Sequence, residues 1–412
     1  MWGDIIIAFT LAFITAFMLT PLTIKLARKL GAIDTPKDYR RVNKIAMPRL
    51  GGLAVIAGFT LSVFYLLFVM SIEGNIDLAV DSYDKKLLGF FAGAVIIGIT
   101  CFIDDVKGIR AVVKLLAQIV AAMVCIKTGI VIDDIKIGVL ENLKIPLVVS
   151  EIITVFWIVG ITNALNLIDG LDGLSTGITL ISSGSLLLVF SLNGSPLVSI
   201  VLITALAGAL TGFLPYNFNP AKTFIGDTGS NFLGYCLAII SILGIAKTYT
   251  AIVIIAPIIV LALPLFDTFM AVVRRVIKGK SLKAIMTPDS NHLHHRMIRK
   301  GFTQKQAVLT LYFITATLGM FTVILMESGP FKAFSFILLI AIVIAAGYKE
   351  FFKQRLLTTE VNDYDKEEYK YSEDMEEHIR HDKDPMFGRN DKEPKKEKAK
   401  KPSNKKKKVN KK

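Results

Sequence analysis

Long apolar runs separated by short polar segments dominate the hydrophobic pattern of this chain. Most of them approach the roughly 18–20 residues that a helix needs to cross about 30 Å of hydrocarbon. The pattern therefore predicts an all-α polytopic membrane protein with about eleven transmembrane helices. The runs lie near residues 5–24, 50–70, 87–103, 111–127, 148–163, 174–192, 198–214, 231–246, 250–273, 308–326 and 332–349.

Two segments depart from this pattern. Residues 131–147 alternate between apolar and polar positions and are expected to form a short extracytoplasmic β-hairpin. From residue 350 the chain turns acidic and then lysine-rich, with almost no aliphatic side chains, and such a composition cannot bury a core. We therefore predict an integral membrane domain over 1–349 and a disordered, charged cytoplasmic tail over 350–412.

Basic residues set the expected orientation. Loops 25–49 and 274–307 are rich in lysine and arginine, whereas 71–86 carries more acids than bases. Because positively charged loops stay in the cytoplasm, the N-terminus is expected outside and the tail inside. On that count the polar loops that face the cytoplasm are 104–110, 164–173, 215–230 and 274–307.

The composition supports the same class of protein. The chain has 412 residues, of which 53% are hydrophobic and 20% charged, and this excludes an ordinary soluble domain. The N-terminal run lacks a basic leader and a cleavage site of small residues, so it is interpreted as a first span. The lysine-rich end suits a solvated tail near anionic lipid better than a nucleic-acid partner. Three unpaired cysteines inside apolar runs are interpreted as core residues: Cys101, Cys125 and Cys236.

Acidic and amide side chains follow several apolar runs, and the expected orientation places them on one side of the membrane. A carboxylate at the centre of a membrane helix costs roughly 2.5–3.5 kcal/mol, so carboxylates at membrane depth need a cation or a water-filled site. Their convergence predicts a metal-dependent enzyme at the membrane face. The residues are Asp104, Asp105, Asn163, Asn166, Asp169, Asp172 and Asp227.

Residues 163–173, NALNLIDGLDG, carry polar side chains at every third position. If the helix continues through residue 172, these side chains form one slowly drifting polar face. A solvated helix end is the alternative interpretation, but the neighbouring carboxylates favour a functional site.

The segment FIGDTGSN, residues 224–231, places Asp227 between glycines at the start of an apolar run. It resembles a helix N-terminus with free amide groups, which suits a phosphate, and its carboxylate suits Mg²⁺. Elsewhere, the adjacent Asp104 and Asp105 repel one another, which makes one of them a candidate base or metal ligand. A helix bearing Lys114 follows this pair.

Three histidines and an arginine cluster in NHLHHR, residues 291–296. No cysteine or His-Glu pairing supports zinc, so an anion-binding loop at a diphosphate fits better. Asp267, in the ninth run, is interpreted as half of a buried structural pair rather than as a catalytic residue. The motif PRLGG at 48–52 fits either anchoring at the membrane surface or substrate contact.

Mg²⁺, carboxylates, phosphate-directed amides and a basic loop together describe phosphoryl transfer, in which a protein mainly positions groups and neutralises charge. The sequence contains no P-loop, so ATP hydrolysis is not indicated. The motifs FIDD, NALNLIDGLDGL, NFNPAKTFIGDTGSNFLG and NHLHHR resemble those of the polyprenyl-phosphate N-acetylhexosamine-1-phosphate transferases (glycosyltransferase family 4). The resemblance covers roughly residues 1–349.

The resemblance implies transfer of a sugar 1-phosphate from a UDP-sugar to a polyprenyl phosphate, normally undecaprenyl phosphate in the bacterial plasma membrane, with release of UMP. It implies Mg²⁺, with Mn²⁺ as a substitute, at Asn166 and Asp227. Asp104 and Asp105 match a pair that deprotonates or orients the lipid phosphate. The other residues expected to be catalytic are Asp169 and Asp172, and those expected to bind substrate are Lys114, Asn163, His292, His294, His295 and Arg296.

The histidine motif is similar to that of the branch using UDP-N-acetylglucosamine to start teichoic acid, O-antigen or related polymers, although Asn43 stands where that branch usually has a histidine. The alternative within the family is phospho-N-acetylmuramoyl-pentapeptide transferase. The alternative from another class is a cation-coupled secondary transporter, which is disfavoured because the acids lie at one face rather than at the midplane. The oligomeric state stays open, with a homodimer as one option.

Overall fold

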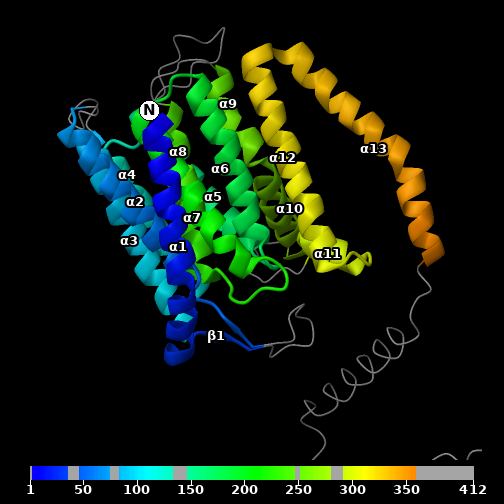
Figure 1. Ribbon diagram of the computed structural model, residues 1–412, viewed down its shortest axis with the longest axis horizontal. Helices are drawn as coiled ribbons and strands as arrows, with labels where there is room; N and C mark the ends of the chain where they lie inside the picture. The colour runs from blue at the N-terminus through cyan, green and yellow to red at the C-terminus, as the bar shows by residue number, and fades with distance from the viewer. Residues whose placement is uncertain are drawn as a thin grey trace, which may run out of the picture. The chain divides into compact units, whose positions relative to one another are not determined.

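The computed structural model describes residues 2–35, 46–74, 83–132, 146–245, 251–279 and 291–358. Residues Met1–Ala345 form one compact unit, which holds every contact discussed below, and Ala346–Lys412 form a second. The helices (Figure 1) are α1 Trp2–Leu30, α2 Gly52–Ile72, α3 Tyr83–Lys107, α4 Ala111–Lys127, α5 Leu147–Ile168, α6 Leu174–Leu192, α7 Leu197–Asn217, α8 Gly226–Ile245, α9 Ala251–Val260, α10 Ala262–Gly279, α11 Leu293–Arg299, α12 Gln304–Ser328 and α13 Pro330–Thr358.

Seven helices in the described part of the chain are long and apolar enough to cross a membrane. This finding confirms the predicted class, an all-α polytopic membrane protein, while the count of eleven spans stays a prediction. Residues 133–145 of the expected hairpin and residues 359–412 of the expected tail lie outside the described residues. Residues 350–358 of that tail belong to α13. The seven helices are α1, α2, α3, α5, α6, α7 and α12.

Helix α7 lies at the centre of the first unit, where α1, α2, α6 and α8 pack around it. Small residues allow this close approach, as is common between membrane helices. A Cβ atom on Gly208 would lie 2.3 Å from the carbonyl oxygen of Phe9, and one on Gly212 would lie 2.3 Å from that of Phe13. The glycines therefore bring the backbones of α1 and α7 into direct contact.

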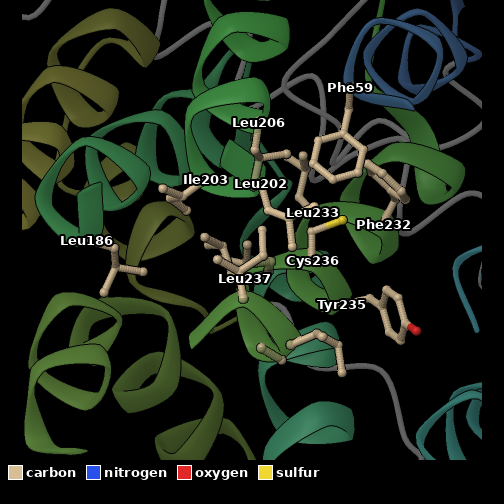
Figure 2. Packing of buried hydrophobic residues seen from close by; sticks show 14 of the residues in the cluster. Phe59, Leu186, Leu202, Ile203, Leu206, Phe232, Leu233, Tyr235, Cys236 and Leu237 are labelled. Carbon is tan, nitrogen blue, oxygen red and sulfur yellow. The ribbon is translucent and has the colours of Figure 1, made fainter. Parts of the chain in front are cut away.

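Helix α8 is the second buried helix, and Figure 2 shows its apolar side chains beside those of α2 and α7. It also packs against α3 and α5. The ring of Phe232 packs edge-on against Phe59 of α2, with 5.5 Å between centroids. Large apolar side chains on the outer helices are exposed instead, among them Phe68 and Phe156, as expected of surfaces that face lipid. The three cysteines are buried and unpaired, which confirms that they are core residues.

The ninth predicted span, 250–273, is divided in the structure into α9 and α10, which meet at Leu261. Pro264 explains the division because it has no N–H to donate to the carbonyl of Val260, one helical turn earlier. The prediction of one continuous helix was therefore wrong at this point.

The PRLGG motif joins two distant parts of the chain. Strand β2 (Met47–Pro48) pairs with β1 (Ile33–Asp34), and Phe224 N–H donates to the carbonyl of Pro48 at 2.8 Å. Further along, Gly52 N–H donates to the carbonyl of Ile225 at 2.9 Å. A Cβ on Gly52 would lie 2.3 Å from the Cα of Gly229, so only glycine fits where α2 crosses α8. These contacts give the motif a structural role at the start of α8.

Candidate active site

The N-terminus of α8 is capped by a carboxylate from α3. Asp227 N–H donates to Asp105 Oδ1 at 3.0 Å, and Thr228 donates to Asp105 Oδ2 from its N–H at 2.8 Å and its Oγ1 at 2.6 Å. A carboxylate is favoured there because the first amides of a helix lack partners and its dipole attracts negative charge. The expectation of free amides for a phosphate was therefore wrong for these two groups.

Asp105 is fully buried and also contacts a cation from the PRLGG motif. The Nε of Arg49 donates to the backbone carbonyl of Asp105 at 2.9 Å and lies 3.7 Å from its Oδ1. With both carboxylate oxygens engaged, Asp105 holds α3, α8 and the PRLGG motif together. The structure thus gives the two adjacent aspartates different surroundings.

Asp104 is held by a lysine that also contacts Asp227. The Nζ of Lys114 lies 2.8 Å from Asp104 Oδ2 and 3.3 Å from Asp227 Oδ1, while Asp104 Oδ1 accepts a hydrogen bond from Ile109 N–H at 2.7 Å. Two carboxylates share one ammonium group, so this group of side chains keeps one negative charge. That surplus favours a further cation.

Asn166 approaches the same carboxylate from α5. Its Nδ2 donates to Asp227 Oδ1 at 2.6 Å and to Ser230 Oγ at 2.9 Å. Ser230 Oγ in turn donates to the carbonyl of Gly226 at 2.9 Å, so its oxygen is available to accept from an amide. The Nδ2 of Asn166 therefore faces Asp227. A half-turn of the side-chain amide would exchange its two outer atoms, so that the oxygen would face Asp227 instead.

Helix α5 ends at Ile168, so the predicted polar face does not continue through residue 172. Gly173, with φ +78°, occupies the left-handed conformation that glycine tolerates and turns the chain into α6. In this turn Asp169 accepts a hydrogen bond from Ser175 Oγ at 2.6 Å. Burial, with the nearby charges of other carboxylates, raises the pKa of Asp169 to about 7 against the effect of that hydrogen bond.

Asp172 supports the loop that leads to α8. Its Oδ2 accepts hydrogen bonds from Asn219 Nδ2 at 3.0 Å and from Ala221 N–H at 3.1 Å. The carboxylate thereby fixes the path of the chain between α7 and α8. Its predicted catalytic role stays a prediction.

The histidine segment of α11 is anchored by Asp267. His292 Nδ1 lies 2.9 Å from Asp267 Oδ2, and Leu293 N–H donates to Asp267 Oδ1 at 2.9 Å. The prediction that Asp267 is half of a buried structural pair is confirmed. The same contact directs His292 into the protein, although a substrate contact had been expected of it.

His294 packs against the turn after α5. A Cβ on Gly170 would lie 2.2 Å from His294 Nε2, so the missing side chain makes room for the ring. Burial, and then the charges of the neighbouring histidines, lowers the pKa of His294 to about 3, which keeps it neutral at physiological pH. On the same helix His295 is half-buried, with its ring centroid 4.2 Å from that of His294, and Arg296 is exposed, so both are less enclosed than the other two histidines.

The four motifs thus meet at one end of the helices. Three residues of the quoted motifs take part in these contacts without having been predicted as site residues: Thr228, Ser230 and Arg49. Gln118 also takes part, although in the sequence it is only a polar residue in the fourth apolar run, 111–127, which is the weakest span on hydropathy alone. In the part of the chain that the structure describes, no group of three or more His, Cys, Asp or Glu side chains is arranged to hold a metal ion. The predicted ligands, Asn166 and Asp227, offer an amide and a carboxylate oxygen, the kind of donor that Mg²⁺ binds in proteins together with waters and substrate phosphates, and the metal itself stays a prediction.

Comparison with known proteins agrees with this geometry. Residues 87–245 match glycosyl transferase family 4. The chain is 36% identical over 341 residues to the probable undecaprenyl-phosphate N-acetylglucosaminyl 1-phosphate transferase of Bacillus subtilis, covering 82% of this chain and 89% of that protein. It is 33% identical over 328 residues to the decaprenyl-phosphate N-acetylglucosaminephosphotransferase of Mycobacterium tuberculosis, covering 74% and 78%.

A third relative, the phospho-N-acetylmuramoyl-pentapeptide-transferase of Staphylococcus epidermidis, is 33% identical over 244 residues, covering 57% of this chain and 74% of that protein. The family expected from the motifs is therefore confirmed. The chain belongs to glycosyl transferase family 4, among the polyprenyl-phosphate N-acetylhexosamine-1-phosphate transferases.

Proposed function

We propose that this enzyme transfers N-acetylglucosamine 1-phosphate from UDP-N-acetylglucosamine to undecaprenyl phosphate at the cytoplasmic face of the bacterial plasma membrane. An oxygen of the lipid phosphate attacks the sugar-bearing phosphorus, the bond from that phosphorus to the UMP oxygen breaks, and UMP leaves. The product, a lipid-linked sugar diphosphate, is the first membrane intermediate of an envelope polymer such as teichoic acid. The relatives from Bacillus subtilis and Mycobacterium tuberculosis described above are both named as transferases of N-acetylglucosamine phosphate.

One observation carries the proposal: four helices bring Asp104, Lys114, Asn166 and Asp227 together within hydrogen-bonding distance. Asp227 and Asn166 would hold Mg²⁺, which, when bound, neutralises charge on the diphosphate and supports departure of UMP. Lys114 supplies positive charge to the transferring phosphoryl group. Asp104, which is paired with Lys114 and almost completely buried, orients the lipid phosphate or accepts its proton.

The remaining residues support this arrangement. Asp105 fixes Asp227 by capping α8, and Asp172 fixes the loop before it. Asp169, with a pKa near 7, is able to exchange a proton near neutral pH at the nucleotide site. His295 and Arg296, which are less enclosed than the other two histidines, contact the diphosphate and sugar.

Purified enzyme with undecaprenyl phosphate, Mg²⁺ and a panel of UDP-sugars tests the proposal through release of UMP. We expect turnover with UDP-N-acetylglucosamine, none after chelation of the metal, and loss of at least about 100-fold in Asp227→Ala and Asn166→Ala, since each removes charge stabilisation at the reacting phosphate. Turnover with UDP-N-acetylmuramoyl-pentapeptide instead would assign the other branch. Cation-coupled uptake into vesicles without release of UMP would identify a transporter.

A further inference from the structure

A layer of three amide side chains lies directly beneath the candidate active site. Gln118 of α4 stands between the other two: its Oε1 accepts a hydrogen bond from Asn163 Nδ2 at 2.6 Å, and its Nε2 donates to Asn231 Oδ1 at 2.8 Å. We call Gln118, Asn163 and Asn231 the amide triad. It connects α4, α5 and α8, the three helices that carry Lys114 and the expected metal ligands.

Each member of the amide triad lies one helical turn from a residue of the site on the same helix. Side chains three or four positions apart share a helix face, so fixing one of them fixes the direction of the other. The pairs are Gln118 with Lys114, Asn163 with Asn166, and Asn231 with Asp227.

The amide triad is sensitive to helix rotation because two of its members are buried and Asn163 is partly buried. Gln118 is 2% exposed and Asn231 0%, so no solvent is at hand to replace a broken hydrogen bond, and an unpaired buried amide is costly. Both groups of the Gln118 amide are used, one toward each neighbouring helix. Rotating α4 or sliding it along its axis breaks these bonds, and the same movement takes Lys114 away from Asp104 and Asp227.

We propose that the amide triad is a positioning layer for cation binding: it fixes α4, α5 and α8 so that Lys114, Asn166 and Asp227 meet at one point. The inference rests on the proposed function, because it assigns the divalent cation to Asp227 and Asn166. Asn163, expected to bind substrate, acts in this way through its contact with Gln118.

The same helices provide a matched control one layer deeper. Tyr235 of α8 lies four residues beyond Asn231, and its hydroxyl is 3.0 Å from Cys125 Sγ of α4 and donates to the carbonyl of Phe90 at 2.8 Å. Figure 2 shows Tyr235 among the buried side chains of α8. Tyr235→Phe removes buried hydrogen bonds between α8 and its neighbours without touching the amide triad.

The experiment compares Gln118→Met, which keeps length and removes both hydrogen bonds, with Tyr235→Phe and the unaltered enzyme. Mn²⁺ binding is measured from the paramagnetic resonance signal of the free ion, in detergent with UDP-N-acetylglucosamine and no lipid acceptor, together with the thermal unfolding midpoint. Substituting a residue that orients a metal ligand without itself binding the metal typically weakens metal affinity by about 10–100-fold. We therefore expect about tenfold weaker Mn²⁺ binding in Gln118→Met and, in a separate assay with undecaprenyl phosphate added, slower UMP release, but unchanged values per folded molecule in Tyr235→Phe.

Unchanged Mn²⁺ affinity in folded Gln118→Met would overturn the inference, and so would an equal loss in Tyr235→Phe, since either result makes the amide triad a purely structural contact. If Gln118→Met does not fold, Asn163→Ala takes its place, because it removes one of the two hydrogen bonds of the amide triad. Its Mn²⁺ affinity is then compared with that of Tyr235→Phe in the same way. Failure of the unaltered enzyme to bind Mn²⁺ or to release UMP would instead refute the proposed function, so the two failures are distinguishable.

Discussion

The acidic cluster (Asp104, Lys114, Asn166 and Asp227) and the histidine segment (Asp267 with His292, His294 and His295) accommodate polar side chains in different ways. In the acidic cluster every side chain contacts another one across helices, and the group keeps a surplus negative charge. In the histidine segment Asp267 is paired with His292, and His294 is buried as a neutral ring. Under the proposed function the first region would bind a cation, whereas most of the second is packed as a support.

The difference shows that a cluster of chemically active residues in a sequence does not have one role throughout. Of the three histidines, two face inward and only His295 keeps access to solvent, together with Arg296. Of the two adjacent aspartates, Asp104 faces Lys114 and Asp105 caps a helix. Neighbouring positions on a helix point in different directions, which separates their functions.

The largest effect that separates the two regions is expected from Lys114→Met. The substitution leaves two carboxylates without their shared cation and removes positive charge from the reacting phosphate, so UMP release should fall by about 100–1000-fold. Steady-state rates in detergent measure this. Lys107 is an exposed lysine at the C-terminal end of α3 and serves as the control. In Lys107→Met the rate of UMP release should stay within about twofold of that of the unaltered enzyme. A Lys114→Met enzyme with near-normal turnover would show that the acidic cluster does not carry the reaction.

A smaller effect, on stability, is expected from Asp105→Ala. Removing a helix N-cap costs up to about 2 kcal/mol, and here the amides of Asp227 and Thr228 lose their partner together with the hydroxyl of Thr228. The unfolding midpoint in detergent should therefore fall more than in Asp104→Ala. Equal stability of the two variants would contradict the division of roles between the adjacent aspartates.

The smallest effect is a coupling energy, which tests the contact between the histidine segment and the turn that follows Asn166 and ends α5. Gly170→Ala introduces a methyl group against the His294 ring, and such overpacking costs about 1–3 kcal/mol. Adding His294→Ala should relieve part of this cost, giving a favourable coupling of at least about 0.5 kcal/mol in the double-variant cycle. Gly184→Ala on α6 has no atom within 4 Å of the new Cβ and should leave stability nearly unchanged. Simple additivity in the cycle would mean that α11 does not pack on this turn.

Much of the fold could be predicted from the sequence because apolar runs of bilayer length report membrane helices directly. That Asp104, Asn166 and Asp227 lie at the same end of the helices could be predicted by counting the spans between them, because this depends only on the order of the apolar runs. The contacts confirm that these residues lie at one end of the helices. Their placement on the cytoplasmic side stays a prediction.

Directions of side chains could not be read from the sequence in the same way. The GDTGS segment has the composition of a free helix N-terminus, and nothing in the local sequence shows that a carboxylate 122 positions earlier occupies it. Gln118 looked like a defect in a weak span because its two amide partners lie on other helices. The division of the ninth run was missed because Pro264 was treated as part of a continuous apolar stretch.

The backbone bonds between the PRLGG motif and the start of α8 have a consequence for biosynthesis. The Pro48 carbonyl also accepts a hydrogen bond from the hydroxyl of Thr223, 175 positions later, an interval of roughly 10–35 s at a synthesis rate of about 5–20 residues per second. From the synthesis of Asp105 onward, 122 positions before Asp227, Asp105 and Arg49 are both present, but the amides of residues 227 and 228 do not yet exist. In a chain interrupted before residue 228, the carboxylate of Asp105 therefore lacks hydrogen-bond donors that it has in the finished protein.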